Sequence, residues 1–203
     1  QGIIGHQFWL ATQALDIWAM TLFFYCFRDR EILLDWFDEL CGARLTTSWY
    51  RIGGVERDFT PSLFAKLKQF LHYFPSKIDE YVIFLEKNRI WIARTKGVAV
   101  ISAEDAVNFG LSGPTLRGSG VDYDLRKAEP YSAYPKCEFS VPLGKNGDTY
   151  DRYWIRVMEL YESVKIVKQC LEQIQDGPIM ADVPSVTLPP KDRVFTNLES
   201  MIQ

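Results

Sequence analysis

The chain has 203 residues, of which 47% are hydrophobic and 24% are charged, and its formal net charge is −3. This composition is typical of one globular domain, or of one large part of a longer chain. Because a near-neutral chain without a run of basic residues lacks the usual surface for phosphate contacts, nucleic-acid binding is not expected.

The first predicted element is an apolar helix over residues 3–27. Its stretch HQFWLATQALDIWAMTLFFYCF, residues 6–27, contains a single formally charged residue, Asp16. The length would suffice to cross a bilayer, but a carboxylate near the centre of such a helix opposes insertion by roughly 2.5–3.5 kcal/mol. We therefore expect a buried core helix and no membrane-spanning segment.

Asp16 is the most unusual residue of this helix, because an unpaired carboxylate is costly to bury. Residues three, four, seven or eight apart share a helix face, so on an unbroken helix Asp16 shares its face with Phe8, Thr12, Met20, Phe23 and Phe27. This face could form the wall of a site for a flat apolar ligand with a polar head group. The alternative is a core helix on which Asp16 caps or pairs with a residue elsewhere. His6 cannot be that partner on an unbroken helix, since ten residues span ~15 Å.

Helices are also predicted for most of the following sequence. RDREILLDWFDELCG, residues 28–42, has apolar residues at helical spacing and closes at glycine, and residues 44–60 form a polar connector. Separate helices are expected to begin at Pro61 and at Pro75, and a short helix to be capped by Ser102. The longest helix is expected from Asp148 to about Ile174, after a short strand at residues 137–144.

Residues 109–134 contain four glycines among prolines and tyrosines, so backbone turns should determine the path of the chain there. An internal salt-bridge network is expected from the charged residues of this stretch, Arg117, Asp124, Arg126 and Lys127. The four cysteines are widely spaced and the chain has only two histidines, so neither a zinc site nor a disulfide framework is expected.

Several stretches together resemble the D subunit of proton-pumping NADH:quinone oxidoreductase, or respiratory complex I, which is itself similar to the large subunit of nickel–iron hydrogenases. They are ALDIWAMTLFFYCFRDRE, RIGGVERD, SAEDAVNFGLSGPTLRGSGVDYDLRKAEPY and FSVPLGKNGDTYDRY. The resemblance covers essentially the whole chain in the same order. It implies a mainly α (α+β) fold with the helical core of the hydrogenase large subunit and minor strands. Residues 1–203 would then be a single partial domain, without the family's N-terminal β-rich part and its C-terminal segment.

The resemblance also implies a function at the quinone cavity next to the terminal iron–sulfur cluster. Asp16 would belong to a proton-donating pair with a histidine of the family's N-terminal part, and the cavity wall would include Phe8, Thr12, Phe23 and Phe27. Quinone would be a substrate, while NADH and the iron–sulfur clusters would be held by other subunits, so this chain would hold no cofactor. The implied partners are other complex I subunits, through which the chain would contact the membrane.

The implied location is the cytoplasmic side of the bacterial inner membrane, with the matrix side of the mitochondrial inner membrane as the alternative. Trp18 and Ala11 stand where the family commonly has glycine. Two other functions remain open: the large subunit of a membrane-bound, energy-converting hydrogenase, and a scaffold that docks neighbours without chemistry. The 203 residues alone are expected to be inactive.

Overall fold

The fold was obtained as a computed structural model, which describes residues 1–202. Over these residues the regular structure consists of ten α-helices, one 3-10 helix and two short strands, so the expected mainly α class is confirmed. The chain forms two compact units, one of Gln1–Leu33 and Lys68–Gln173, the other of Leu34–Leu67 and Ile174–Gln203. Among the described residues, no helix is both long enough and apolar enough to cross a membrane.

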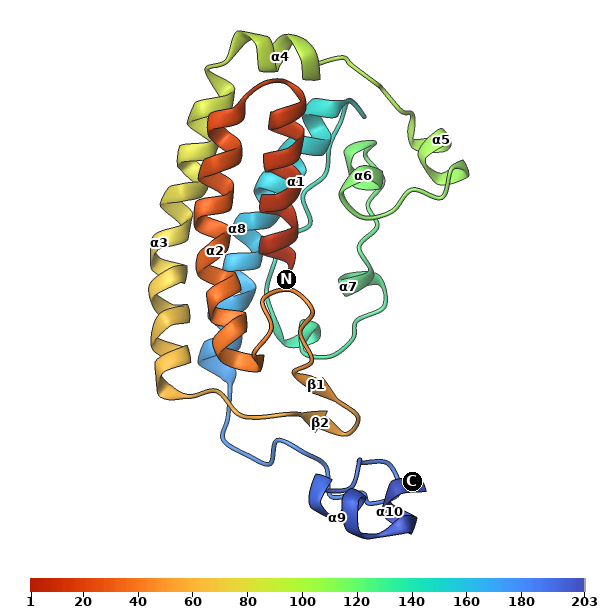
Figure 1. Ribbon diagram of the computed structural model, residues 1–203. Helices are drawn as coiled ribbons and strands as arrows, with labels where there is room; N and C mark the ends of the chain where they lie inside the picture. The colour runs from red at the N-terminus through yellow and green to blue at the C-terminus, as the bar shows by residue number, and fades with distance from the viewer. Residues whose placement is uncertain (203) are drawn as a thin grey trace. The chain divides into compact units, whose positions relative to one another are not determined.

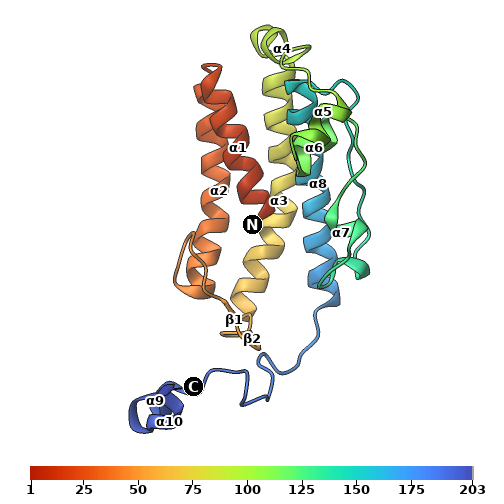
Figure 2. The same cartoon turned by 90° about the vertical axis from the view of Figure 1, so that its right-hand side faces the viewer.

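Long helices form the first unit. They are α1 (Gly2–Asp16), the first part of α2 (Met20–Cys41), most of α3 (Pro61–Glu86) and α8 (Thr149–Gln173), and they lie side by side in both views (Figures 1 and 2). The core contains the fully buried side chains of Leu10, Phe74, Ile78, Tyr81, Leu85, Tyr153, Ile155 and Leu160. Burial of one such aliphatic or aromatic side chain contributes roughly 1.5–3 kcal/mol, which makes this packing the main source of stability.

The helix expected to begin at Pro75 does not exist as a separate element, because Pro75 lies inside α3. An internal proline costs a helix about 3 kcal/mol through a lost hydrogen bond and a clash. The apolar pattern nevertheless continues through both halves of α3, and its buried side chains offset that cost: Phe70, Leu71, Phe74, Ile78, Tyr81 and Leu85. The next helix, α4 (Arg89–Thr95), is separate and is capped by Asn88, whose Oδ1 accepts the amide of Ile90 at 2.9 Å.

Short helices interrupt the glycine-rich middle of the chain: α5 (Ala103–Asn108), α6 (Gly113–Gly118), α7 (Leu125–Ala128) and the 3-10 helix η1 (Tyr134–Lys136). Ser102 caps α5 as expected, with Oγ accepting the amide of Asp105 at 3.0 Å. The strand expected at residues 137–144 is wrong. Two of its backbone amides, those of Glu138 and Ser140, donate to side chains of α8 and not to another strand.

The second unit contains the only strands of the described residues, β1 (Tyr50–Arg51) and β2 (Gly54–Val55), which pair antiparallel. They lie within residues 44–60, the stretch that was expected to be a polar connector. The hairpin also bonds to a later segment, since the amide of Val55 donates to the carbonyl of Ile179 at 2.9 Å. The unit further contains the last part of α2, the start of α3, and the short helices α9 (Lys191–Thr196) and α10 (Leu198–Ile202).

Candidate functional site

Asp16 is the last residue of α1, so the prediction of one unbroken helix over residues 3–27 is wrong. The amide of Ala19 donates to the carbonyl of Ala14 and the amide of Trp18 to that of Leu15, both at 2.8 Å. These two bonds define a Schellman motif, in which the residue at the position of Trp18 has left-handed backbone geometry. Trp18 has φ 65°, a conformation that normally favours glycine. The chain then reverses and enters α2 at Met20.

This turn changes the geometry of the predicted site. Met20, Phe23 and Phe27 lie on α2 and therefore do not share a helix face with Asp16. The Asp16 side chain is exposed. Within residues 1–202 it takes part in no hydrogen bond or ion pair, so any partner must come from outside this part of the chain.

The predicted aromatic residues nevertheless meet, because α1 and α2 are antiparallel neighbours. Phe8 of α1 lies 6.1 Å from Phe27 of α2, measured between ring centroids, and Phe27 stacks on Phe23 at 4.3 Å. The guanidinium of Arg30 lies over the rings of Phe8 and Phe27, at 5.6 and 5.4 Å from their centroids. We call these four residues the aromatic cluster. Phe8 is 49% exposed, so part of the cluster faces outward.

Thr12 is half-buried on α1 and its hydroxyl is directed at its own helix. Its Oγ1 donates to the carbonyls of Phe8 and Trp9, both at 3.1 Å. The hydroxyl proton is therefore engaged, and Thr12 can offer a ligand only the acceptor capacity of its oxygen.

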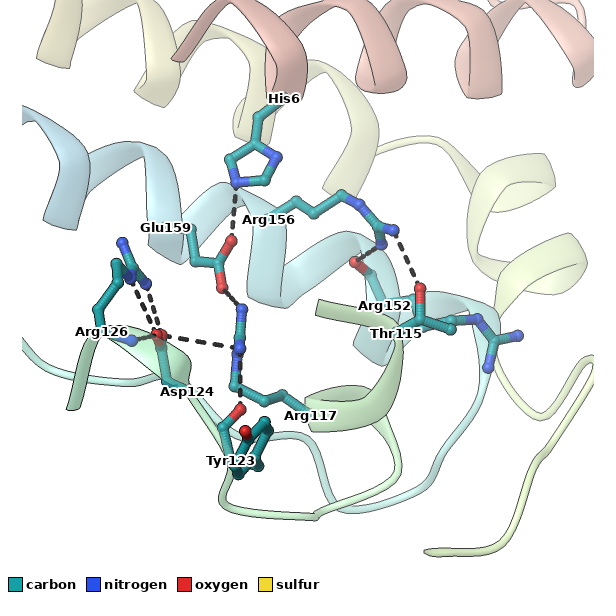
Figure 3. Close-up of polar contacts among 9 residues, drawn as sticks. All are labelled: His6, Thr115, Arg117, Tyr123, Asp124, Arg126, Arg152, Arg156 and Glu159. Carbon is teal, nitrogen blue, oxygen red and sulfur yellow. Dashed lines mark hydrogen bonds and ion pairs between the residues drawn. The ribbon is translucent and has the colours of Figure 1, made fainter. Parts of the chain in front are cut away.

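A buried network of charges connects α1, α6, α7 and α8 (Figure 3). His6 Nε2 lies 2.7 Å from Glu159 Oε2, and the second oxygen of Glu159 accepts from Arg117. Arg117 Nη1 lies 3.7 Å from Asp124 Oδ2, while Arg126 donates two hydrogen bonds to Asp124, at 3.0 and 2.6 Å. The expected salt-bridge network is thus confirmed for Arg117, Asp124 and Arg126, but among the described residues Lys127 makes no ion pair, and its Nζ lies 5.1 Å from the centroid of the Phe139 ring. Its extension to His6 and Glu159 was not predictable, because those residues are 153 positions apart.

The network shifts the acidity of its carboxylates. Burial acts to raise the pKa of Glu159, but the hydrogen bond from His6 and the charge of Arg117 outweigh it, so the pKa is lowered. The pKa of Asp124 is likewise lowered, because hydrogen bonds from Arg126 outweigh burial. Both carboxylates are therefore held in the ionised form, which suits them to a structural role.

A further buried carboxylate, Asp29 on α2, lies in the charged run RDRE and is fully buried. It accepts two hydrogen bonds from Arg28, at 2.8 and 2.9 Å, and one each from the hydroxyls of Tyr73 at 2.8 Å and Tyr81 at 2.5 Å. Burial raises the pKa of Asp29, but these donors together lower it. Nothing in the sequence singles out Asp29, since a charged run usually indicates a solvated helix face.

Arg156 of α8 is a half-buried cation close to α1. Its guanidinium lies 4.0 Å from the centroid of the Trp9 ring and donates to the carbonyl of Arg152 at 2.7 Å. Burial lowers the pKa of Arg156 to about 10. Over residues 1–202, no group of three or more histidine, cysteine, aspartate or glutamate side chains is arranged to hold a metal ion.

Comparison with known proteins assigns this architecture. The family model described as the 49 Kd subunit of respiratory-chain NADH dehydrogenase matches residues 16–203. The D subunit of the NADH-quinone oxidoreductase of Geotalea uraniireducens is 48% identical over 198 residues, which are 98% of this chain and 51% of the relative. A D-type subunit of the same enzyme from Thermodesulfovibrio yellowstonii is 54% identical over 186 residues, 91% of this chain and 46% of the relative. The chain thus spans about half the length of the curated relatives it matches.

Proposed function

Because the chain belongs to the family of the 49 Kd subunit of respiratory-chain NADH dehydrogenase, we propose that it works as a subunit of an NADH:quinone oxidoreductase. In this proposal the end of α1 and the aromatic cluster form part of the wall of the quinone site, and Asp16 belongs to a pair that delivers protons to the quinone. The proposal rests on the family and on the placement of Asp16.

The placement of Asp16 is the single observation that carries the proposal. A carboxylate in the last turn of a helix faces the negative end of the helix dipole, which is unfavourable by roughly 0.3–1 kcal/mol. Asp16 is exposed, and residues 1–202 give it no compensating hydrogen bond or cation. A residue that breaks a local rule without a structural gain is a candidate for function.

The chemistry of quinone reduction requires such a group. Two electrons and two protons convert a quinone to a quinol, and a positioned acid can supply a proton to the developing phenolate oxygen. The aromatic cluster offers flat apolar surface on the two helices that the turn after this acid connects, and the cation of Arg30 is held against the rings of Phe8 and Phe27. Residues 1–202 would supply one wall only.

The remaining proposals follow from the family. The neighbour that carries the terminal iron–sulfur cluster would complete the cavity, and the electrons would reach the quinone from that cluster. NADH would be oxidised on other subunits, and this chain would contact the membrane through its partners, on the cytoplasmic side of a bacterial inner membrane.

The test is Asp16→Asn in the assembled complex, which keeps the shape of the side chain and removes its acidity. We expect the ratio of NADH:quinone activity to NADH:ferricyanide activity in membranes to fall by about tenfold or more, since general acids contribute roughly 10²–10⁴-fold. Asp38→Asn is the matched control, because Asp38 is also exposed on a long helix. A ratio equal to wild type, with normal assembly, would exclude Asp16 from proton delivery.

A purely structural or scaffolding role predicts a different outcome. In that case Asp16→Asn lowers the amount of assembled complex while the activity ratio of what does assemble stays at the wild-type value. Measuring the amount of complex together with both activities therefore separates the two roles.

A further inference from the structure

Two of the four cysteines are in contact. The Sγ atoms of Cys137 and Cys170 lie 3.9 Å apart, although the residues are 33 positions apart in sequence. Cys137 is half-buried on an irregular segment, and Cys170 is exposed near the end of α8. Both are free thiols in the structure.

The segment that carries Cys137 is fixed along α8. We call residues 136–140 the strap. The side-chain amide of Gln169 donates to the carbonyl of Glu138 at 2.8 Å, and its oxygen accepts the amide of Glu138 at 2.7 Å. Two further bonds hold the strap, from Gln173 Nε2 to the carbonyl of Lys136 at 3.2 Å and from the amide of Ser140 to Glu162 Oε2 at 2.9 Å. Hydrogen bonds on both sides of Cys137 therefore hold it beside Cys170.

The two sulfur atoms are within reach of a covalent bond. A disulfide needs an S–S distance of about 2.05 Å, so the sulfurs must approach by roughly 2 Å. Rotation of the exposed Cys170 side chain, together with a small shift in the last turn of α8, can supply this movement. The strap is already in place, so no segment has to be rebuilt to close the bond.

The surroundings of Cys137 and Cys170 differ from those of the other two cysteines. Burial raises the pKa of Cys170, and the neighbouring Cys137 raises it further by its charge and by a hydrogen bond. The contact between the two thiols allows either sulfur, once oxidised, to be attacked by the other. The other cysteines are placed differently: Cys26 is fully buried, and Cys41 Sγ lies 3.2 Å from the carbonyl of Phe37.

We propose that Cys137 and Cys170 form a peroxide-sensitive dithiol, whose oxidation to a disulfide fixes the strap covalently to α8. The thiolate of one of the two cysteines attacks hydrogen peroxide, so that the O–O bond breaks, an S–O bond forms and hydroxide leaves. The other thiol then loses its proton and attacks the sulfenic sulfur, forming the S–S bond and releasing the second hydroxide. The two protons from the thiols convert both hydroxides to water, so two thiols and one peroxide give one disulfide and two waters.

Formation of this disulfide would also restrain residues of the buried charge network outside the strap. Phe139 is buried, and the guanidinium of Arg126 lies 4.8 Å from the centroid of its ring. Arg126 in turn holds Asp124 in the buried charge network. A covalent anchor at Cys137 would therefore restrict opening of the segment that covers this end of the network, as constraints on local unfolding do elsewhere.

The test uses the purified native protein, treated with hydrogen peroxide, quenched with catalase and alkylated before peptide mass spectrometry. We expect a cross-linked peptide pair that contains Cys137 and Cys170, lacks two hydrogen atoms and separates on reduction. Cys137→Ser and Cys170→Ser should each abolish the pair, and in at least one of them dimedone should trap a sulfenic acid on the remaining cysteine, while Cys41→Ser should leave the cross-link unchanged. The proposal is overturned if both thiols are alkylated in full after peroxide treatment, or if each is oxidised separately without a cross-link.

A second measurement reports on the strap itself. Trypsin cleaves after lysine, and Lys136 directly precedes Cys137. We expect peroxide to slow cleavage after Lys136 by roughly tenfold in the wild-type protein, because the cross-link suppresses local opening, and to leave the rate unchanged in Cys170→Ser. Equal slowing in both proteins would show that peroxide acts elsewhere and would contradict the proposed disulfide between Cys137 and Cys170.

Discussion

Glu159 is the residue through which the buried charge network joins α1 to the glycine-rich middle of the chain. Only 5% of it is exposed, and its two carboxylate oxygens have different partners, His6 and Arg117. Glu159→Gln keeps the size of the side chain and removes the charge. Arg117, itself 5% exposed, would then lose its nearest anion.

The size of the effect follows from that loss. Removing one partner of a buried ion pair typically costs 3–5 kcal/mol, because the remaining charge is left without compensation. Arg117 still has Asp124 at 3.7 Å and donates to the carbonyl of Tyr123 at 3.1 Å, which reduces the free-energy cost of losing Glu159. We therefore expect a decrease of about 3 kcal/mol in the free energy of unfolding, at the low end of that range. For a chain of this size this corresponds to a fall in Tm of roughly 6–12 °C.

The stability difference between wild type and Glu159→Gln should depend on pH, in a direction set by the pKa shift of Glu159. The pKa of Glu159 is lower in the folded protein than its ordinary value of 4.5. A group with a lowered folded pKa contributes stability that is present above its unfolded pKa and is lost as the pH falls through its folded pKa. The gap between wild type and Glu159→Gln should therefore be full near neutral pH and shrink progressively below about pH 4.5.

The assay is urea unfolding followed by tryptophan fluorescence at several pH values between neutral and acidic. Glu172→Gln is the matched control, since Glu172 lies on the same helix and is exposed, and its effect should stay within about 0.5 kcal/mol. The reasoning is refuted if Glu159→Gln is as stable as this control at pH 7. It is also refuted if the difference from wild type persists undiminished in acid.

Two further predictions concern the backbone. Trp18 is 86% exposed and has φ 65°. Trp18→Gly should relieve roughly 1–2 kcal/mol of left-handed strain, at a cost of about 0.5–1 kcal/mol in the conformational entropy of glycine. Urea unfolding should therefore show that Trp18→Gly is as stable as wild type or more stable, and that Trp18→Val is less stable. A Cβ at Gly54 would lie 2.1 Å from the carbonyl oxygen of Ile179, so Gly54→Ala should displace the segment bonded to the hairpin at a cost of about 1–3 kcal/mol. We expect faster amide hydrogen exchange at Val55 and Ala181, whose amides donate the hydrogen bonds between the hairpin and this segment. Unchanged exchange at both amides would contradict the prediction.

The parts of the fold that depend on local sequence signals could be predicted. The Ser102 cap of α5 and the apolar periodicity of α8 are signals of this kind, and both elements lie where they were expected. The boundary between α1 and α2 could not be read in this way, because the residue that terminates α1 is Trp18, where the helix-stop signal would be glycine. The apolar character continues on both sides of the turn, so periodicity alone predicts one helix.

In the candidate site, too, some residues could be predicted from the sequence, whereas their partners depend on tertiary packing. The aromatic residues Phe8, Phe23 and Phe27 were chosen because they share a face on a helix that does not exist, yet the reversal at Trp18 brings them together from two helices. The partners of His6 and Asp29 could not be predicted from spacing, because tertiary packing alone places Glu159 beside the first and Tyr73 and Tyr81 beside the second.

The three carboxylates Asp29, Glu159 and Asp16 can now be compared directly. Asp29 and Glu159 are buried, accept hydrogen bonds from cations or hydroxyls, and have lowered pKa values, so the folded chain gains stability from each of them. Asp16 is exposed at the unfavourable end of a helix dipole and has no partner within residues 1–202. It therefore does not stabilise this part of the chain, and this difference from Asp29 and Glu159 is the reason why we propose a role for Asp16 at the quinone site.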